Sequence, residues 1–198
     1  MKFSIIEDCS PYYIRFTHDG IDDVVNSCLS SIDGIKFTQG FTHHRLSDEF
    51  AASVLKTIPL SEVFTLKTDR VSLFVTQPGV YYRAHKDGPN CRFSLNYTIK
   101  VLDTECITSW YADADLARYP IDTLGGYSRE ASGFDKTQHT PLKVMTAIAN
   151  EAILFNTDIF HDFDNQNSSN ERIVLTLRAL PQGNIYFADA KKMLFGIE

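Results

Sequence analysis

The sequence predicts a mainly β fold of the α+β class, a sandwich or barrel of short strands with two early helices on one outer face. Aromatic residues are 12% of the 198 residues, with 14 Phe and 9 Tyr, and many lie in β-type runs. These runs are short and are separated by turn signals such as Pro78-Gly79. Helical spacing of apolar residues is found early in the chain, which suits helices that pack against one face of the strands.

The N-terminal part combines strands and helices. Residues 14–16 and 35–46 have the composition of strands. Between them, residues 21–32 carry apolar side chains at helical spacing, with acidic residues near the start that suit a helix N-terminus. A second helix is predicted over 48–58, where Pro59 stops it.

The length favours a single domain over residues 1–198, in which residues 1–60 support a barrel core at 69–180. A polar, turn-rich loop at about 112–140 interrupts this core, and loops of that length are often lids or disordered. The C-terminal stretch 184–198 reads as a strand followed by a short helix. The strands expected in the core lie at 70–77, 80–85, 92–102, 105–112, 142–149, 151–156 and 172–180.

Composition argues against several classes of protein. The net charge is −6 and no long basic run occurs, so an electrostatic nucleic-acid interface is not indicated. The longest apolar runs fall far short of the roughly 20 residues that a membrane-spanning helix needs, and the N-terminus does not read as a signal peptide. The four cysteines have no CxxC spacing, so we expect reduced thiols in a cytoplasmic protein.

The stretch YYRAHKDGPNCRF holds a histidine and an aspartate two positions apart, His85 and Asp87. In an extended segment, residues two apart point to the same side, so both side chains could bind one metal ion. The same residues also suit an ordinary polar turn between two strands. The His-x-Asp pattern alone does not distinguish a turn from part of a metal site.

A third ligand has to come from elsewhere in the chain. Of the six histidines, only His161 lies between two strongly strand-like runs of the later part, 76 residues after His85. Two histidines and one carboxylate leave three metal positions open, the pattern of non-haem Fe(II) oxygenases. Arg172 follows at the start of the next strand, and its planar fork suits the remote carboxylate of a dicarboxylate cosubstrate.

With these residues, the chain resembles the Fe(II)- and 2-oxoglutarate-dependent dioxygenases, and within them the aspartyl/asparaginyl β-hydroxylase-like branch. The resemblance rests on HKDGPNCRFSLNYTI and ILFNTDIFHDFDNQNSSNERIVLTL. It implies a double-stranded β-helix, the cupin-like jelly-roll barrel, with Fe(II) bound by His85, Asp87 and His161. Arg172 would hold the 5-carboxylate of 2-oxoglutarate.

The resemblance also implies roles on the strand that follows the His-x-Asp motif. Arg92 and Asn96 would help to bind the cosubstrate and line the pocket. Ser94 stands where the branch has a second basic residue, and Asn96 stands where it often has a histidine. These departures concern the anchoring of 2-oxoglutarate and not the metal ligands.

The implied reaction consumes O₂ and 2-oxoglutarate, releases succinate and CO₂, and hydroxylates an amino acid, a peptide residue or a related small molecule. Two alternatives stay open: a metal-dependent cupin-type enzyme that does not use 2-oxoglutarate and so does not require Arg172, and a non-catalytic jelly-roll binding module. The expected partner is a small-molecule or peptide substrate, with no nucleic acid or membrane. The oligomeric state is not predicted.

Overall fold

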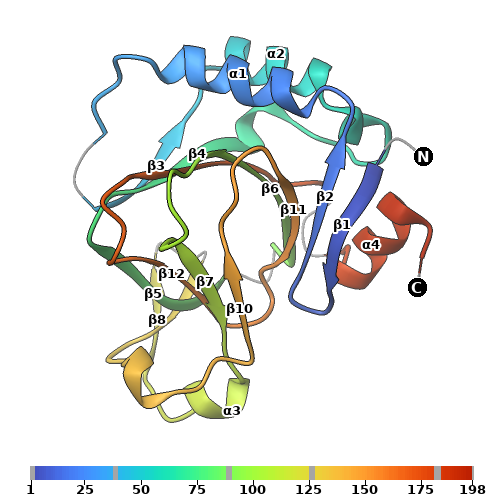
Figure 1. The fold of residues 1–198 in the computed structure, drawn as a ribbon. Coiled ribbons are helices and arrows are strands. Elements are labelled where there is room, and N and C mark those ends of the chain that lie inside the picture. Colours follow the sequence, from blue (N-terminus) through green and yellow to red (C-terminus); the bar gives the residue numbers. More distant parts are fainter. Residues whose placement is uncertain (1–2, 38–39, 88–90, 125–127, 181–183, 198) are drawn as a thin grey trace.

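Two antiparallel β-sheets face each other, and two helices cover the outer face of the larger one (Figure 1). The computed structural model describes residues 3–37, 40–87, 91–124, 128–180 and 184–197. The strand order within each sheet differs strongly from the order along the chain, because neighbouring strands come from distant parts of the sequence. This arrangement is a cupin-like jelly-roll, which confirms the predicted fold class.

The larger sheet has the strand order β1-β2-β11-β6-β13-β4-β3, and the smaller sheet has the order β10-β7-β12-β5-β9-β8. The strands of the larger sheet are β1 (Phe3–Cys9), β2 (Tyr13–His18), β11 (Ala152–Asn156), β6 (Phe93–Lys100), β13 (Arg172–Leu177), β4 (Val71–Thr76) and β3 (Phe41–Arg45). Those of the smaller sheet are β10 (Lys143–Thr146), β7 (Ile107–Trp110), β12 (His161–Asn165), β5 (Val80–Asp87), β9 (Ser128–Ala131) and β8 (Ile121–Leu124).

The helices lie mainly outside the sheets. They are α1 (Ile21–Ile32), α2 (Asp48–Thr57), α3 (Asp113–Leu116) and α4 (Phe187–Phe195), with short 3₁₀ turns at Pro59–Glu62, Thr68–Arg70 and Lys136–Gln138. Acidic residues in the first turn of α1 and of α2 suit the positive end of each helix dipole. At α2, the Ser47 side chain also accepts a hydrogen bond from the Phe50 N–H, which satisfies one of the free donors of the first turn.

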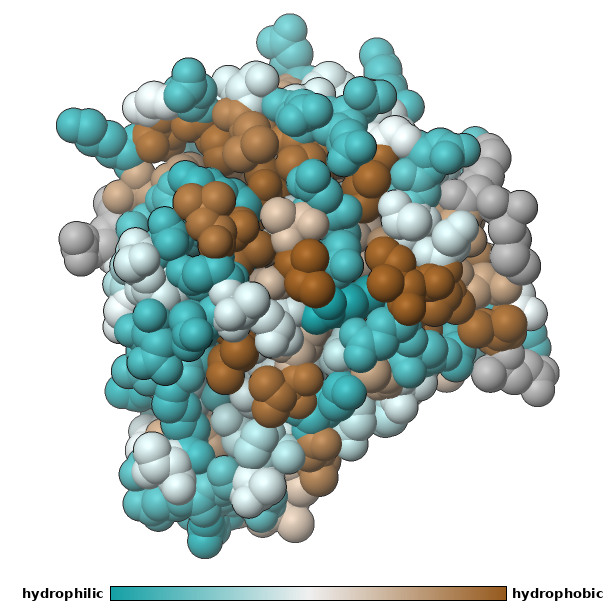
Figure 2. Space-filling model, viewed as in Figure 1, coloured by the Kyte–Doolittle hydropathy of each residue, from teal (hydrophilic) through white to brown (hydrophobic). Residues whose placement is uncertain are grey.

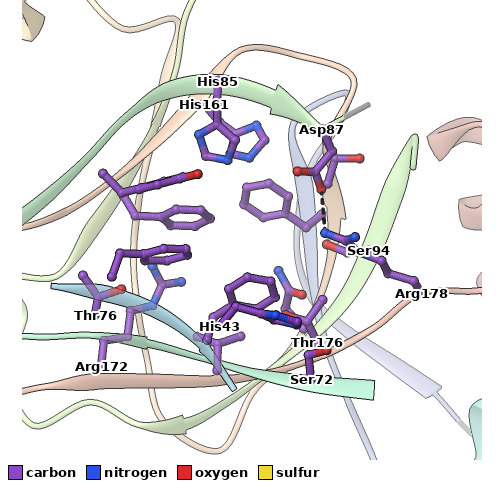
Figure 3. A pocket seen from close by; sticks show the side chains of 18 of the residues that line it. His43, Ser72, Thr76, His85, Asp87, Ser94, His161, Arg172, Thr176 and Arg178 are labelled. Carbon is purple, nitrogen blue, oxygen red and sulfur yellow. Dashed lines mark hydrogen bonds and ion pairs between the residues drawn. The ribbon is translucent and has the colours of Figure 1, made fainter. Parts of the chain in front are cut away.

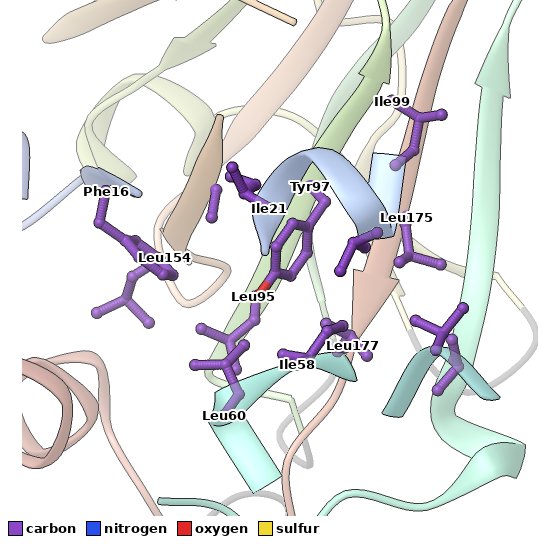
Figure 4. Close-up of a cluster of buried hydrophobic side chains, with 14 of the residues drawn as sticks. Phe16, Ile21, Ile58, Leu60, Leu95, Tyr97, Ile99, Leu154, Leu175 and Leu177 are labelled. Carbon is purple, nitrogen blue, oxygen red and sulfur yellow. The ribbon is translucent and has the colours of Figure 1, made fainter. Parts of the chain in front are cut away.

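The main hydrophobic core lies between the larger sheet and the helices (Figure 4). In β6 the odd-numbered residues face this core, and Leu95 and Tyr97 there have no exposed surface. The odd-numbered positions of β13, including Leu175 and Leu177, do the same. The even-numbered residues of both strands therefore point to the opposite face, toward the smaller sheet.

The structure agrees with the two predicted helices and differs from the sequence predictions at several strands. Strands β1, β8, β9 and β12 were not predicted, and in the stretch 35–46 only β3 forms among the described residues. The predicted loop at 112–140 contains α3, β8 and β9, because β9 adds to the edge of β5 and gains a ladder of backbone hydrogen bonds there. Near the C-terminus the helix α4 forms but no strand precedes it in the described part.

The surface is mixed in character. On the face shown in Figure 2, hydrophobic side chains form small groups that hydrophilic residues separate, as is usual for exposed protein surface. No helix in the described part of the chain has the length and apolar composition needed to cross a bilayer.

Replacement of Leu95 by alanine tests the core beneath the helices. Leu95 is fully buried between β6 and the helices, so Leu95→Ala should lower the free energy of unfolding by about 2–5 kcal/mol. Leu102→Ala is the matched control, because Leu102 is 67% exposed and its loss should change stability by less than about 0.5 kcal/mol. Urea unfolding monitored by Trp110 fluorescence measures both, and equal effects would contradict this placement of the core.

Candidate functional site

A cavity of about 450 Å³ lies between the two sheets (Figure 3). It is lined from the larger sheet by alternate residues of β3, β4, β6 and β13, and from the smaller sheet by residues of β5 and β12. The lining residues from these six strands are Phe41, His43, Ser72, Phe74, Thr76, Tyr82, His85, Asp87, Ser94, Asn96, His161, Phe163, Arg172, Val174 and Thr176.

His85 and His161 stand directly opposite each other in the ladder of β5 and β12, with ring centroids 4.4 Å apart. The Nδ1 atom of His85 lies 2.8 Å from the Arg83 carbonyl oxygen, and Nδ1 of His161 lies 2.8 Å from that of Ile159. A carbonyl oxygen only accepts hydrogen bonds, so each Nδ1 carries the proton. Each Nε2 therefore keeps its lone pair and faces the cavity, which is the form in which imidazole binds a metal.

Burial keeps both imidazoles neutral. It lowers the pKa of His85, against an opposing effect of the nearby Asp87 carboxylate. It also lowers the pKa of His161 well below its ordinary value, and the neighbouring His85 acts in the same direction. The two rings are thus held as neutral donors of nitrogen lone pairs at neutral pH.

A β-bulge in β5 directs His85 into the cavity. His161 pairs with His85 and Phe163 pairs with Tyr82, so two steps along β12 match three along β5. The additional residue lets Tyr82 and His85 both face the cavity although they are three positions apart, which regular alternation would forbid.

Asp87 lines the cavity beside the histidines, but its carboxylate pairs with Arg178, with 3.4 Å between Arg178 Nη2 and Asp87 Oδ2 (Figure 3). Among the residues that the structure describes, no three His, Cys, Asp or Glu side chains stand together in a geometry that would hold a metal ion. The assignment of Asp87 as the third ligand therefore stays a prediction, and it requires the carboxylate to turn toward the imidazoles.

Arg172 reaches from the larger sheet into the space between the sheets. It is 3% exposed, its Nη1 donates to Thr108 Oγ1 at 3.3 Å, and its guanidinium lies 5.0 Å from the centre of the Phe163 ring. Its Nε is buried without a hydrogen-bond partner, and no described carboxylate forms an ion pair with it. An uncompensated buried cation is costly, so this position is suited to an anionic ligand.

The three residues predicted on the strand after His-x-Asp have different surroundings. Ser94 and Asn96 line the cavity, and Asn96 Oδ1 is buried without a partner. Arg92 is not part of the cavity lining. Arg92 Nη1 pairs with Asp158 Oδ2 at 2.9 Å, and the guanidinium carbon lies 4.4 Å from the centre of the Tyr186 ring. Strand β6 begins only at Phe93, so the alternation of side chains along β6 does not determine which way Arg92 points.

A buried carboxylate ties the histidine-bearing strands together on their other face. Asp162, next to His161, accepts hydrogen bonds from Tyr81 Oη at 3.0 Å, Tyr111 Oη at 2.7 Å and the Ser109 N–H at 3.0 Å. Burial raises the pKa of Asp162 to about 6, and these three donors act in the opposite direction. The network connects β12 to β5 and β7 and so fixes the strand that presents His161.

Several cavity residues were not singled out from the sequence. Thr176 lies on the same side of β13 as Arg172, and Arg178, one residue beyond the end of this strand, also lines the cavity. Alternation of side chains along β13, applied from Arg172 onward, could have found Thr176. Phe41 could not have been predicted as a cavity residue in this way. It lies on β3, and no local sequence pattern indicates that β3 pairs at the edge of the larger sheet.

No protein-family model matches the sequence, and no curated protein matches it. Solved structures share its fold. HygX from Streptomyces hygroscopicus, with nickel, 2-oxoglutarate and hygromycin B bound, has a TM-score of 0.54 at 9% identity over 85% of this chain and 83% of its own. EvdO2 from Micromonospora carbonacea var. aurantiaca, complexed with 2-oxoglutarate, has a TM-score of 0.52 at 10% identity over 84% and 86%. The epimerase SnoN, in complex with Fe³⁺, alpha ketoglutarate and nogalamycin RO, has a TM-score of 0.51 at 9% identity over 85% and 79%.

Removal of one hydroxyl tests the Asp162 network. Tyr111→Phe leaves a buried carboxylate with one donor fewer and should lower the free energy of unfolding by about 1–3 kcal/mol. Tyr12→Phe is the control, because no hydrogen bond of the Tyr12 hydroxyl is found among the described residues. If urea unfolding shows no difference between the two variants, Asp162 does not hold the strands together.

Proposed function

We propose that this protein is an Fe(II)- and 2-oxoglutarate-dependent oxygenase that hydroxylates an amino acid, a peptide residue or a related small molecule. The observation that carries the proposal is a single cavity that contains two imidazole Nε2 atoms and the buried guanidinium of Arg172, which forms no ion pair with a carboxylate among the described residues. The jelly-roll fold supports it, because the three solved neighbours named above were each crystallised with 2-oxoglutarate.

The residues at the histidine pair fit a divalent iron. Imidazole nitrogen suits Fe(II), and the neutral state of both rings leaves no proton to displace. In the proposed site, His85 and His161 hold the metal through Nε2 and Asp87 supplies one carboxylate oxygen. Both imidazoles are held by backbone carbonyls, so their lone pairs are oriented before any metal arrives.

The cation at Arg172 fits the far carboxylate of the cosubstrate. A guanidinium pairs with a carboxylate through two parallel hydrogen bonds, and Arg172 has a buried Nε that lacks a partner. Asn96 and Ser94 place further polar atoms along the same wall. The roles of Asn96 and Ser94 remain part of the proposal, whereas Arg92 is not among the residues that line the cavity and pairs with Asp158.

When bound together, Fe(II) and 2-oxoglutarate supply an oxidant that is generated from O₂, with release of succinate and CO₂. The chain itself orients the cosubstrate and limits access of water. The aromatic side chains of Tyr82, Phe155 and Phe163 surround the histidine pair and leave it an apolar environment. The cavity volume of about 450 Å³ is within the range of small-molecule pockets, which favours a small substrate or a single side chain.

The reaction type within this class comes from the sequence resemblance. The motifs around His85 and His161 resemble the aspartyl/asparaginyl β-hydroxylase-like branch, and this favours hydroxylation over other outcomes. A cupin-type enzyme that works without 2-oxoglutarate would not require the buried cation of Arg172 in the cavity. A non-catalytic barrel would not require two imidazoles whose Nε2 atoms face a cavity.

Metal binding tests the histidine pair. The protein should bind one Mn(II) per chain, and His161→Ala should weaken this binding by more than about 100-fold, because one of two preoriented nitrogen donors is lost. The control is His44→Ala, since His44 lies on β3 outside the cavity lining and packs against Phe37. Calorimetric titration measures both, and a wild-type protein that binds no Mn(II) contradicts the proposed function.

Cosubstrate binding tests Arg172. In the Mn(II)-loaded protein, Arg172→Gln should weaken 2-oxoglutarate binding by at least about tenfold while metal affinity is kept, since the charge-assisted pair with the far carboxylate is lost. Arg172→Lys should recover part of the affinity through its charge alone. Equal 2-oxoglutarate affinities in calorimetry for wild type and Arg172→Gln would favour a cupin-type enzyme without this cosubstrate.

A further inference from the structure

Arg178 lies at the end of the cavity opposite Arg172 (Figure 3). Arg178 follows β13 directly, six residues after Arg172, so the two positions are about 20 Å apart along the strand. The backbone N–H of Arg178 donates to the Arg70 carbonyl oxygen at 3.1 Å, which fixes the chain at this point. The histidine pair lies on the opposite wall between the two arginines.

Arg178 retains hydrogen-bonding capacity. Its contact with Asp87 uses one nitrogen, Nη2, at 3.4 Å, whereas a guanidinium has five N–H donors. Its side chain is 29% exposed, so a ligand in the cavity can reach it. Two hydroxyl groups flank this end, because Ser72 and Thr176 stand opposite each other in the ladder of β4 and β13 and both line the cavity.

The formal charges of the cavity favour an anion in addition to the cosubstrate. The lining contains three arginines, Arg70, Arg172 and Arg178, and two aspartates, Asp69 and Asp87, which leaves an excess of one positive charge with neutral histidines. Fe(II) and the 2-oxoglutarate dianion cancel each other, so their binding does not change this excess. A third occupant with a single negative charge would neutralise the cavity.

We propose that the substrate carries a carboxylate, which Arg178 binds together with the hydroxyls of Ser72 and Thr176. This inference rests on the proposed function, since the charge balance includes Fe(II) and 2-oxoglutarate. A carboxylate matches the planar fork of arginine and accepts from hydroxyl groups at the same time. Arg178 is thus the residue that determines specificity, and it places the rest of the substrate toward the histidine pair.

Pairs of carboxylates and their isosteric amides test this assignment. The protein is loaded with Mn(II) and saturated with 2-oxoglutarate, and propionate, propionamide, benzoate and benzamide are titrated in turn. Paramagnetic relaxation of the probe protons by Mn(II) reports binding beside the metal without any turnover. At least one carboxylate should bind about tenfold more tightly than its amide, as expected for a charge-assisted contact.

The variants assign the preference to Arg178. Arg178→Gln should remove the difference between carboxylate and amide, and Arg178→Lys should keep much of it because the charge remains. Arg45→Gln is the matched control, since the Arg45 side chain is 62% exposed and lies outside the cavity lining, and it should leave the preference unchanged. Mn(II) and 2-oxoglutarate affinities of each variant show that it is folded and loaded.

Three outcomes would overturn the inference: no carboxylate preference in a wild-type protein that binds Mn(II) and 2-oxoglutarate, a preference that persists in Arg178→Gln, and displacement of 2-oxoglutarate by the carboxylate probe. A wild-type protein that fails to bind Mn(II) or 2-oxoglutarate contradicts the proposed function instead, so the two failures are distinct.

Discussion

The register between β5 and β12 is the constraint on which the candidate site depends. These strands come from separate parts of the chain, and their pairing sets His85 and His161 side by side. Because side chains alternate between the faces of a strand, a slip of one residue would turn one imidazole out of the cavity. The bulge in β5, the carbonyls that hold each Nδ1 and the Asp162 network on the other face all stabilise this one register.

The division of the larger sheet into two unlike faces explains how a polar cavity can exist inside a small protein. Its outer face is apolar and packs against α1 and α2, which form the main core. Hydrophobic burial there offsets the cost of placing Arg172 and Asn96 between the sheets. The N-terminal helices therefore contribute directly to stability. Without them, apolar side chains would have to fill the space between the two sheets to form a core, and no polar cavity could lie there.

Much of the site could be predicted from local sequence. His85, Asp87, His161 and Arg172 were chosen by type, spacing and neighbouring strand signals, and all four line one cavity. Strand β12 was missed because HDFDN reads as polar. Its aspartates are satisfied by Tyr81 and Tyr111 and by Lys136, which are distant in sequence.

Other features depend on tertiary contacts that no local pattern encodes. The bulge in β5 follows from the pairing with β12, and the pairing of β9 with the edge of β5 gives structure to a stretch that reads as a loop. The family resemblance implies a role in the cavity for Arg92, whose parity matches that of Ser94 and Asn96. Parity holds only within a strand, and β6 starts one residue after Arg92.

The interleaved strand order also bears on how this protein acquires its site during folding. His85 and His161 are 76 residues apart, and β12 lies between β5 and β7 in the smaller sheet. Pairings of such long range close large loops, so they form slowly and late compared with helices or hairpins. A nascent chain would expose its histidines separately and bring them together only as the barrel closes. The two imidazoles cannot meet before β5 and β12 have paired, so a metal ion held by both reports that this long-range pairing is in place.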